Sequence, residues 1–92
     1  MSIYKFQLYI FDNHPQSRFT RQLITQIFER TSFSCHLDII DVQQSPHLAE
    51  AERIWAIPTL VKTFPPPSQR AIGTFEDTSQ LLQWLDSCFF SV

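Results

Sequence analysis

The sequence contains little cysteine or glycine, has no long hydrophobic run, and shows no excess of basic residues. Its two cysteines, Cys35 and Cys88, lie far apart and form neither a CxxC motif nor a zinc-type cluster. No apolar run approaches the ~20 residues of a membrane-spanning helix, and the first residues do not resemble a signal peptide. A net charge of −2 argues against phosphate-driven nucleic-acid binding. We therefore expect a cytoplasmic protein with reduced cysteines that binds neither nucleic acid nor a membrane.

The chain is rich in apolar side chains for its size. It has 92 residues, of which 43% are hydrophobic and 17% charged, and it includes nine phenylalanines, two tryptophans and two tyrosines. This composition excludes a disordered chain, and the length predicts one domain over residues 1–92. A domain this small buries only roughly 60–65% of its unfolded surface, so burial in a homo-oligomer is a further expectation.

The hydrophobic pattern of the first half predicts a strand, a helix and a second strand. Residues 4–11 alternate apolar and polar at first and are then apolar on both faces, which favours a strand. Pro15 suits a helix start, and residues 15–31 carry apolar side chains at helical spacing, namely Phe19, Leu23, Ile24, Ile27 and Phe28. Residues 36–42 predict the second strand. No hairpin turn separates the two strands, so they are expected to pair in parallel.

The second half predicts a short helix, two strands and a last helix. Ser45 and Pro46 indicate a helix start, residues 58–64 and 70–75 read as strands, and Gly73 suggests a bulge or a close backbone approach. Asp77 and Gln80 resemble a capping box before the last apolar stripe. Structural roles are expected for the single glycine and for four of the prolines: Pro58, Pro65, Pro66, Pro67 and Gly73.

The resulting order, βαβαββα, is that of an α/β single domain of the thioredoxin-like class. Ile57-Pro58-Thr59 before an apolar strand resembles a motif of this class and implies a cis peptide bond at Pro58. Thioredoxin enzymes carry reactive cysteines after the first strand, where this chain has residues 12–17 without a thiol. A thiol oxidoreductase therefore lacks its nucleophile at the expected position.

Four short motifs follow one another along the chain. Residues 8–17 contain Leu-Tyr-Ile and then Asn-x-Pro-x-Ser, and residues 40–50 contain Ile-Asp-Val and then Pro-x-Leu-Ala-Glu. Residues 58–62 read Pro-Thr-Leu-x-Lys, and residues 65–73 read Pro-Pro-Pro-x-x-Arg-x-Ile-Gly. In this order the motifs resemble the KaiB family, small proteins of the cyanobacterial circadian clock and of related bacterial systems. The resemblance covers roughly residues 4–86.

The chain departs from the family pattern at several positions. Phe11-Asp12 replaces an expected Ala-Gly, Gln44 stands where a lysine is usual, and Gln69 replaces the first arginine of a pair. The ending Leu81…Gln83-Trp84-Leu85 is similar to the KaiB-like sensor domain at the N-terminus of the clock histidine kinase SasA. We interpret the chain as a divergent, stand-alone KaiB paralogue.

The resemblance implies a non-enzymatic protein that needs no cofactor. KaiB proteins bind the N-terminal ring of the ATPase KaiC, so the implied partner is a KaiC-type ATPase hexamer whose phosphorylation or ATPase cycle is modulated. They are also metamorphic, with a resting dimer or tetramer and a thioredoxin-like binding monomer. Residues 86–92 suit a strand as well as a helix, but the helix start at Asp77 favours the thioredoxin-like form. A second hypothesis is an adaptor that resembles the SasA input domain and recruits a kinase or a KaiA-like regulator.

By resemblance, the partner-binding residues lie after the second predicted strand and on the short predicted helix, and one further arginine lies three residues before Gly73. They are Gln43, Gln44, His47, Glu50, Arg53 and Arg70. The alternative for Arg53 is a solvated surface charge, and for Arg70 an edge-strand charge that blocks aggregation. Trp55 is either a binding anchor or, as we favour, a core or oligomer-packing residue.

The remaining polar residues give no clear site. The three histidines, His14, His36 and His47, are not at metal-ligand spacing, so no metal site is expected. The aspartates at 12, 38 and 41 are interpreted as strand-end charges rather than as a catalytic cluster.

Overall fold

The elements of the chain follow one another in the predicted order, which confirms the fold class. The structure is a computed structural model that describes residues 3–73, 75 and 77–90. The helices and strands are β1 (Tyr4–Ile10), α1 (Pro15–Arg30), β2 (Cys35–Asp41), α2 (Pro46–Ala51), β3 (Thr59–Phe64), β4 (Gln69–Ile72) and α3 (Thr78–Phe90).

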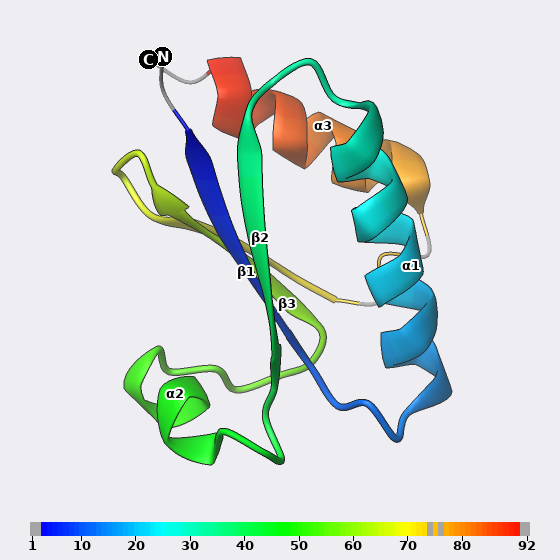
Figure 1. The fold of residues 1–92 in the computed structure, drawn as a ribbon, viewed down its shortest axis with the longest axis vertical. Helices are drawn as coiled ribbons and strands as arrows, with labels where there is room; N and C mark the ends of the chain where they lie inside the picture. Colours follow the sequence, from blue (N-terminus) through cyan, green and yellow to red (C-terminus); the bar gives the residue numbers. More distant parts are fainter. Residues whose placement is uncertain (1–2, 74, 76, 91–92) are drawn as a thin grey trace.

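A four-stranded mixed sheet forms the centre of the molecule, with the strand order β2-β1-β3-β4. β1 and β2 pair in parallel, from Tyr4 opposite Cys35 to Ile10 opposite Asp41, because α1 crosses between them as the sequence predicts. β3 pairs antiparallel with both β1 and β4. The carboxyl ends of β1 and β2 therefore lie at one edge of the sheet, next to α2 (Figure 1).

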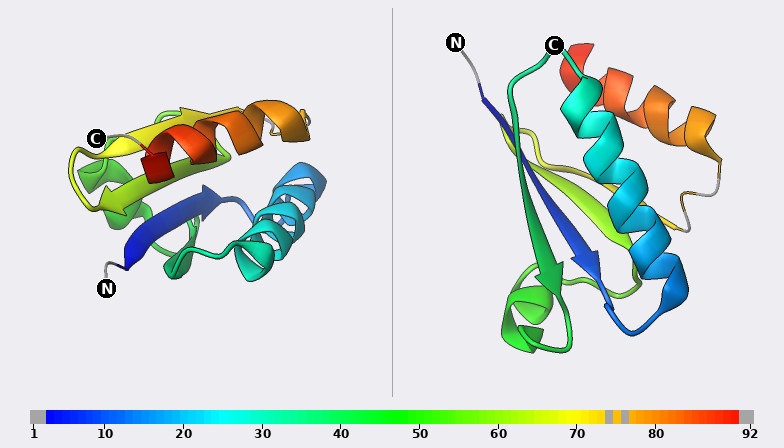
Figure 2. Two further views of the ribbon diagram at one scale, coloured as in Figure 1. Left: turned by 90° about the horizontal axis from the view of Figure 1, so that it is seen from above. Right: turned by 45° about the vertical axis from the view of Figure 1, so that its right-hand side comes forward.

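The helices cover the two faces of the sheet unequally. Figure 2 shows α1 and α3 on one face, while the short α2 lies on the other. The larger core cluster is on the first face and includes Phe6, Leu8, Ile10, Ile24, Leu60, Leu81, Leu85 and Cys88. The smaller cluster lies beneath α2 and consists of Tyr9, Ala49 and Val61 with partly buried Ile40, Val42 and Ile54. Because a six-residue helix covers little area, much of the second face stays open.

The middle strands are buried on both faces, as predicted for β1. Tyr9 and Ile10 are both almost inaccessible but point to opposite faces, as consecutive strand residues do. Lys62 on β3 is only 2% exposed, and its charge acts on the Cys88 thiol of α3. Lys62 is thus buried on the face of the sheet that α3 covers.

Two details of the helices differ from the prediction. Phe19 is 53% exposed and is not part of the buried stripe of α1. The rest of the predicted stripe, Leu23, Ile24, Ile27 and Phe28, packs in or against the core, with Ser17 and Thr20 also buried on this side. The small Ser17 lets the helix approach the sheet, and its Oγ accepts a hydrogen bond from the Phe11 N–H at 3.1 Å. Ser45 precedes α2 as predicted, but its side chain makes no capping hydrogen bond.

Gly73 has a role in backbone conformation. Its φ is +140°, a value that side chains rarely allow, while a Cβ placed there would meet no heavy atom within 4 Å. The expectation of a close backbone approach is therefore wrong. The register irregularity of the sheet lies between Lys5 and Phe6 of β1, so the expectation of a bulge at Gly73 is not met either. The peptide bonds before Pro58, Pro65 and Pro67 are cis, the first as the resemblance implies.

The last helix continues through the segment for which a strand was the alternative. The Tyr4 hydroxyl donates to the Phe89 carbonyl at 3.2 Å, and the rings of Phe33 and Phe89 stack with centroids 4.4 Å apart. These contacts attach the C-terminal turn of α3 to the start of β1 and to the segment between α1 and β2. Residues 85–90 are thus helical, whereas residue 91 lies outside the described part of the chain.

The helix start at Asp77 is confirmed. Its Oδ1 accepts hydrogen bonds from the backbone N–H groups of Ser79 at 3.0 Å and Gln80 at 3.3 Å, and from the Ser79 hydroxyl at 2.6 Å. Among the described residues, the Gln80 side chain makes no hydrogen bond to Asp77, so the reciprocal bond of a capping box is missing. The Ser79 and Gln80 donors lower the pKa of Asp77 below its ordinary value of 3.8.

We expect Asp77→Ala to lower the melting temperature by about 5 °C at pH 7, because an N-cap is lost. A lowered folded-state pKa stabilises the fold above the ordinary value, and this stabilisation is lost as the pH falls through the folded-state pKa. The difference between wild type and variant must therefore shrink as the pH falls below about 4. Thermal unfolding followed by circular dichroism over a series of acidic pH values measures it, and a difference that never diminishes while both proteins remain folded would contradict the role of the carboxylate.

Candidate functional site

The predicted partner-binding residues lie on one side of the molecule, around α2. Gln43, Gln44, His47, Glu50 and Arg53 are all exposed along one continuous segment of the chain. The Asp41 carboxylate accepts the Gln43 N–H at 2.8 Å and the Asp41 carbonyl accepts the Ser45 N–H at 2.9 Å, which fixes the turn into α2. We call residues 43–57 together with Arg70 and Ile72 the α2 surface.

Arg70 reaches this surface from β4. Its guanidinium donates to the Glu52 carbonyl at 3.0 Å and to the Arg53 carbonyl at 3.3 Å, and it lies 3.8 Å from the Glu52 carboxylate. The side chain thus connects the edge strand to the segment that follows α2. The structure brings Arg70 next to the other predicted residues, although its hydrogen-bonding groups are directed at the chain itself.

The end of α2 is a tight turn. Arg53 has a positive φ of 54°, and the Ile54 N–H donates to the Ala49 carbonyl at 2.9 Å. Ile54 packs against the small cluster of Tyr9, Ala49 and Val61. The chain reverses here, so that Ile54 points inward and the side chain of Arg53 stays exposed.

Trp55 is 87% exposed, so it does not pack in the core of the chain, whereas oligomer packing and a role as a binding anchor both stay predictions. Ile72 of β4 is 60% exposed and Leu48 of α2 is 46% exposed. Sequence analysis missed these two apolar side chains. The available signal was the shortness of the predicted second helix, which is too small to cover the outer part of the sheet.

A buried tyrosine lies beneath the α2 surface. Burial raises the pKa of Tyr9, and the nearby Glu52 charge raises it further, whereas Arg70 acts in the opposite direction. The Tyr9 hydroxyl donates to Gln7 Oε1 at 2.7 Å. Tyr9 is therefore a neutral, hydrogen-bonded support for the surface.

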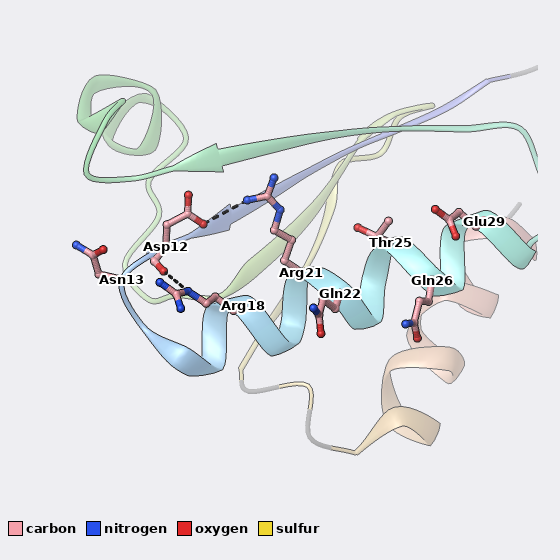
Figure 3. A pocket seen from close by; sticks show the side chains of 8 residues that line it. All are labelled: Asp12, Asn13, Arg18, Arg21, Gln22, Thr25, Gln26 and Glu29. Carbon is pink, nitrogen blue, oxygen red and sulfur yellow. Dashed lines mark hydrogen bonds and ion pairs between the residues drawn. The ribbon is translucent and has the colours of Figure 1, made fainter.

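A polar groove of about 750 Å³ lies elsewhere, along the exposed side of α1 (Figure 3). The Asp12 carbonyl accepts a hydrogen bond from Arg18 Nε at 3.1 Å, and the Asp12 carboxylate pairs with Arg21 at 3.4 Å.

The other two aspartates have partners elsewhere. Asp38 pairs with His36 at 2.9 Å, and the Asp41 carboxylate accepts the Gln43 N–H in the turn before α2. The three aspartates thus have separate partners and do not form one acidic cluster.

The histidines are equally separate. His14 Nδ1 accepts the Gln16 N–H at 3.3 Å at the start of α1, while His36 lies on β2 and His47 on α2. Within the described ranges, no three His, Cys, Asp or Glu side chains are grouped so as to hold a metal ion. The same part of the chain contains no helix that is both long and apolar enough to span a membrane.

The two cysteines are free and lie outside the β1–α1 turn. Burial raises the pKa of the Cys88 thiol to about 11, although the Lys62 charge and a Ser87 hydrogen bond oppose this, and burial also raises the pKa of Cys35. Both thiols are therefore protonated at neutral pH, which disfavours thiolate chemistry.

We expect Cys88 in the folded protein to react with Ellman's reagent at pH 8 about 100-fold more slowly than an ordinary thiol. A pKa near 11 in place of 9.0 reduces the thiolate fraction by about that factor, and burial slows the reaction further. A Cys35→Ser variant isolates Cys88, and its denatured form is the control. Rapid reaction of the folded variant, or insulin reduction by the wild type, would contradict this result.

The sequence is similar to one family of known proteins. The family model described as the KaiB domain matches residues 7–87. The chain is 39% identical over 84 residues to the circadian clock oscillator protein KaiB of Prochlorococcus marinus (strain MIT 9313), covering 90% of this chain and 71% of that protein. It is 38% identical over 84 residues to the protein of the same name from Synechococcus sp. (strain RCC307), covering 90% and 76%.

Among solved structures, the N-terminal domain of Synechococcus elongatus SasA is similar with a TM-score of 0.82 and 26% identity, covering 100% of this chain and 88% of that one. Mitochondrial thioredoxin 3 from Saccharomyces cerevisiae has a TM-score of 0.76 at 15% identity, covering 91% and 77%. The second similarity shows the thioredoxin-like fold alone.

Proposed function

The chain belongs to the KaiB family, and on that basis we propose that it is a non-enzymatic regulator that binds a KaiC-type ring ATPase and modulates its phosphorylation or ATPase cycle. The observation that carries the proposal is the match of the KaiB family model to residues 7–87, almost the whole chain. The relatives that span most of this chain are named circadian clock oscillator proteins.

The α2 surface is the proposed contact with the ring. It contains exposed polar side chains next to exposed apolar side chains, as protein interfaces do. The proposed contacts are Gln43, Gln44, His47, Glu50 and Arg53. We assign Arg70 to the same surface, where its bonds to residues 52 and 53 keep the segment after α2 in place.

A non-covalent role fits the chemistry of the side chains. The thiols have raised pKa values, and the aspartates at 12, 38 and 41 are each bound to a different group. Binding of this kind needs no cofactor.

Fold switching of the C-terminal half is part of the proposal. The thioredoxin-like arrangement, with α3 packed on the sheet, is the proposed binding form. If a resting form competes with it, the apparent affinity for the ring falls by the population of the binding form, and association becomes slow.

An adaptor role like that of the SasA input domain is the second candidate. It is favoured by the structural similarity of the whole chain to the SasA N-terminal domain. In this case the α2 surface recruits a kinase or another regulator.

Co-elution on a size-exclusion column tests the first candidate against the second. The purified protein is mixed with the KaiC homologues of its host and ATP for hours at several temperatures. Co-elution with a ring hexamer, growing slowly with time, is the expected result. A folded protein that co-elutes with none of the homologues would reject the KaiB-type role and leave the adaptor role.

A further inference from the structure

The segment that follows α2 is fixed at several points, although it contains no regular structure. We call residues 52–57 the 52–57 loop. Its first two carbonyls, at Glu52 and Arg53, accept both hydrogen bonds of the Arg70 guanidinium. Its third residue, Ile54, is bound to α2 through the Ala49 carbonyl and packs inward. The Ala56 carbonyl accepts a 2.6 Å bond from the Thr59 hydroxyl. The loop is thus connected to α2, β3 and β4.

The residue at the centre of this fixed loop is the most exposed large apolar side chain among those described. Trp55 lies between Ile54, which is partly buried, and Ala56, whose carbonyl is bound, yet 87% of Trp55 is accessible. Ile72, two residues after Arg70 on the same face of β4, is 60% exposed. Tryptophan is among the residue types that dominate binding energy at protein interfaces, and here it is exposed on a loop whose backbone is hydrogen-bonded on both sides of it.

We propose that Arg70 is a positioning residue that holds the 52–57 loop in one conformation, and that the loop presents Trp55 as the anchor that enters an apolar pocket of a protein partner. Without the arginine, the loop has to be ordered when the partner binds, and this ordering reduces affinity. Arginine suits the task because its planar group donates to two neighbouring carbonyls at once, which a lysine ammonium does not do in the same fixed geometry.

The charges around the loop indicate the chemistry of the partner. The carboxylate of Glu52 is occupied by Arg70, whereas the exposed Arg53 has no ion-pair or hydrogen-bond partner for its side chain within the described residues. Glu50 is exposed one helical turn before it. The partner is therefore expected to place a carboxylate beside its apolar pocket, on the side of Arg53. This inference rests on the proposed function for the identity of the partner, but not for the role of Arg70.

The first test needs no partner. A Trp84→Phe background leaves Trp55 as the single tryptophan, so that time-resolved fluorescence anisotropy reports its motion. We expect Arg70→Ala to increase the nanosecond mobility of Trp55, and Arg70→Lys to do so by a smaller amount. Arg30→Ala is the matched control, since Arg30 is exposed at the end of α1 on the other face. Circular dichroism confirms that each variant is folded. Unchanged Trp55 mobility in a folded Arg70→Ala variant would overturn the role of Arg70.

The second test measures equilibrium binding to the KaiC-type ring. We expect Trp55→Ala to weaken binding by about 30-fold or more, as for a central anchor, and Arg70→Ala to weaken it by about fivefold. Leu82→Ala is the control, because Leu82 is an exposed apolar residue of α3 on the opposite face and should change binding less than twofold. If the wild type binds and Trp55→Ala binds equally well, the anchor is wrong while the proposed function stands. If the folded wild type binds no ring, the proposed function and the anchor role in it fail, and the anisotropy result alone decides the role of Arg70.

Discussion

Leu85→Ala lowers the free energy of unfolding by about 3 kcal/mol, which is a large share of the stability of a domain of this size. Leu85 is 2% exposed and lies in the larger core cluster, between α3 and the sheet. Removing its side chain leaves a cavity where α3 docks on the sheet. Urea unfolding of the purified variant measures the loss.

Leu82→Ala is the matched control for this experiment. It removes the same atoms from the same helix, but Leu82 is 43% exposed, so we expect a loss below about 1 kcal/mol. Hydrogen exchange of α3 should be accelerated in Leu85→Ala much more than in Leu82→Ala. Equal losses in the two variants would mean that α3 does not dock on the sheet through this face in solution.

Arg53→Glu weakens binding to the KaiC-type ring at least tenfold, which corresponds to about 1.4 kcal/mol. The substitution replaces an exposed, unpaired cation of the α2 surface by an anion, and so sets like charges against the expected carboxylate of the partner. Both residues carry a Cβ, so the strain of the positive φ at position 53 stays comparable. Surface plasmon resonance at two salt concentrations measures the affinity and its ionic part.

Arg30→Glu provides the control for charge reversal as such. It changes the net charge by the same amount, but at the end of α1 on the other face of the sheet. We expect an effect below twofold. If both reversals weaken binding equally, the attraction depends on the net charge of the chain, and the assignment of the contact to the α2 surface is wrong.

The order of the elements was predictable from the sequence because local signals coincide there. Pro15 and Pro46 stand at helix starts, Asp77 caps α3, and the absence of a hairpin turn before β2 requires a parallel crossover. Each of these features acts within a few residues, so it can be read before the fold is known.

The predictions that were wrong concern contacts between segments that are distant in the sequence. Phe19 has helical spacing, but α1 turns Ser17, Thr20 and Ile24 to the sheet and leaves Phe19 exposed. Trp55 has the size of a core residue, yet the short α2 and the bonds of the 52–57 loop leave it outside.

The contacts of Arg70 at the candidate site could not be predicted from the sequence for the same reason. Its motif indicates a partner contact or an edge-strand charge, and only the folded chain reveals that its guanidinium binds the carbonyls of residues 52 and 53. The five proposed contact residues and Arg70 lie on one side of the molecule, but their binding role stays a prediction.

Hydrogen exchange of the chain with and without the KaiC-type ring and ATP, read by mass spectrometry, shows which surface of the chain the ring covers. We expect slowed exchange in residues 43–57 and in β4, with little direct protection of the exposed side of α1. Protection confined to α1 and α3, or none under conditions in which the ring is assembled and the chain is folded, would contradict binding through the α2 surface.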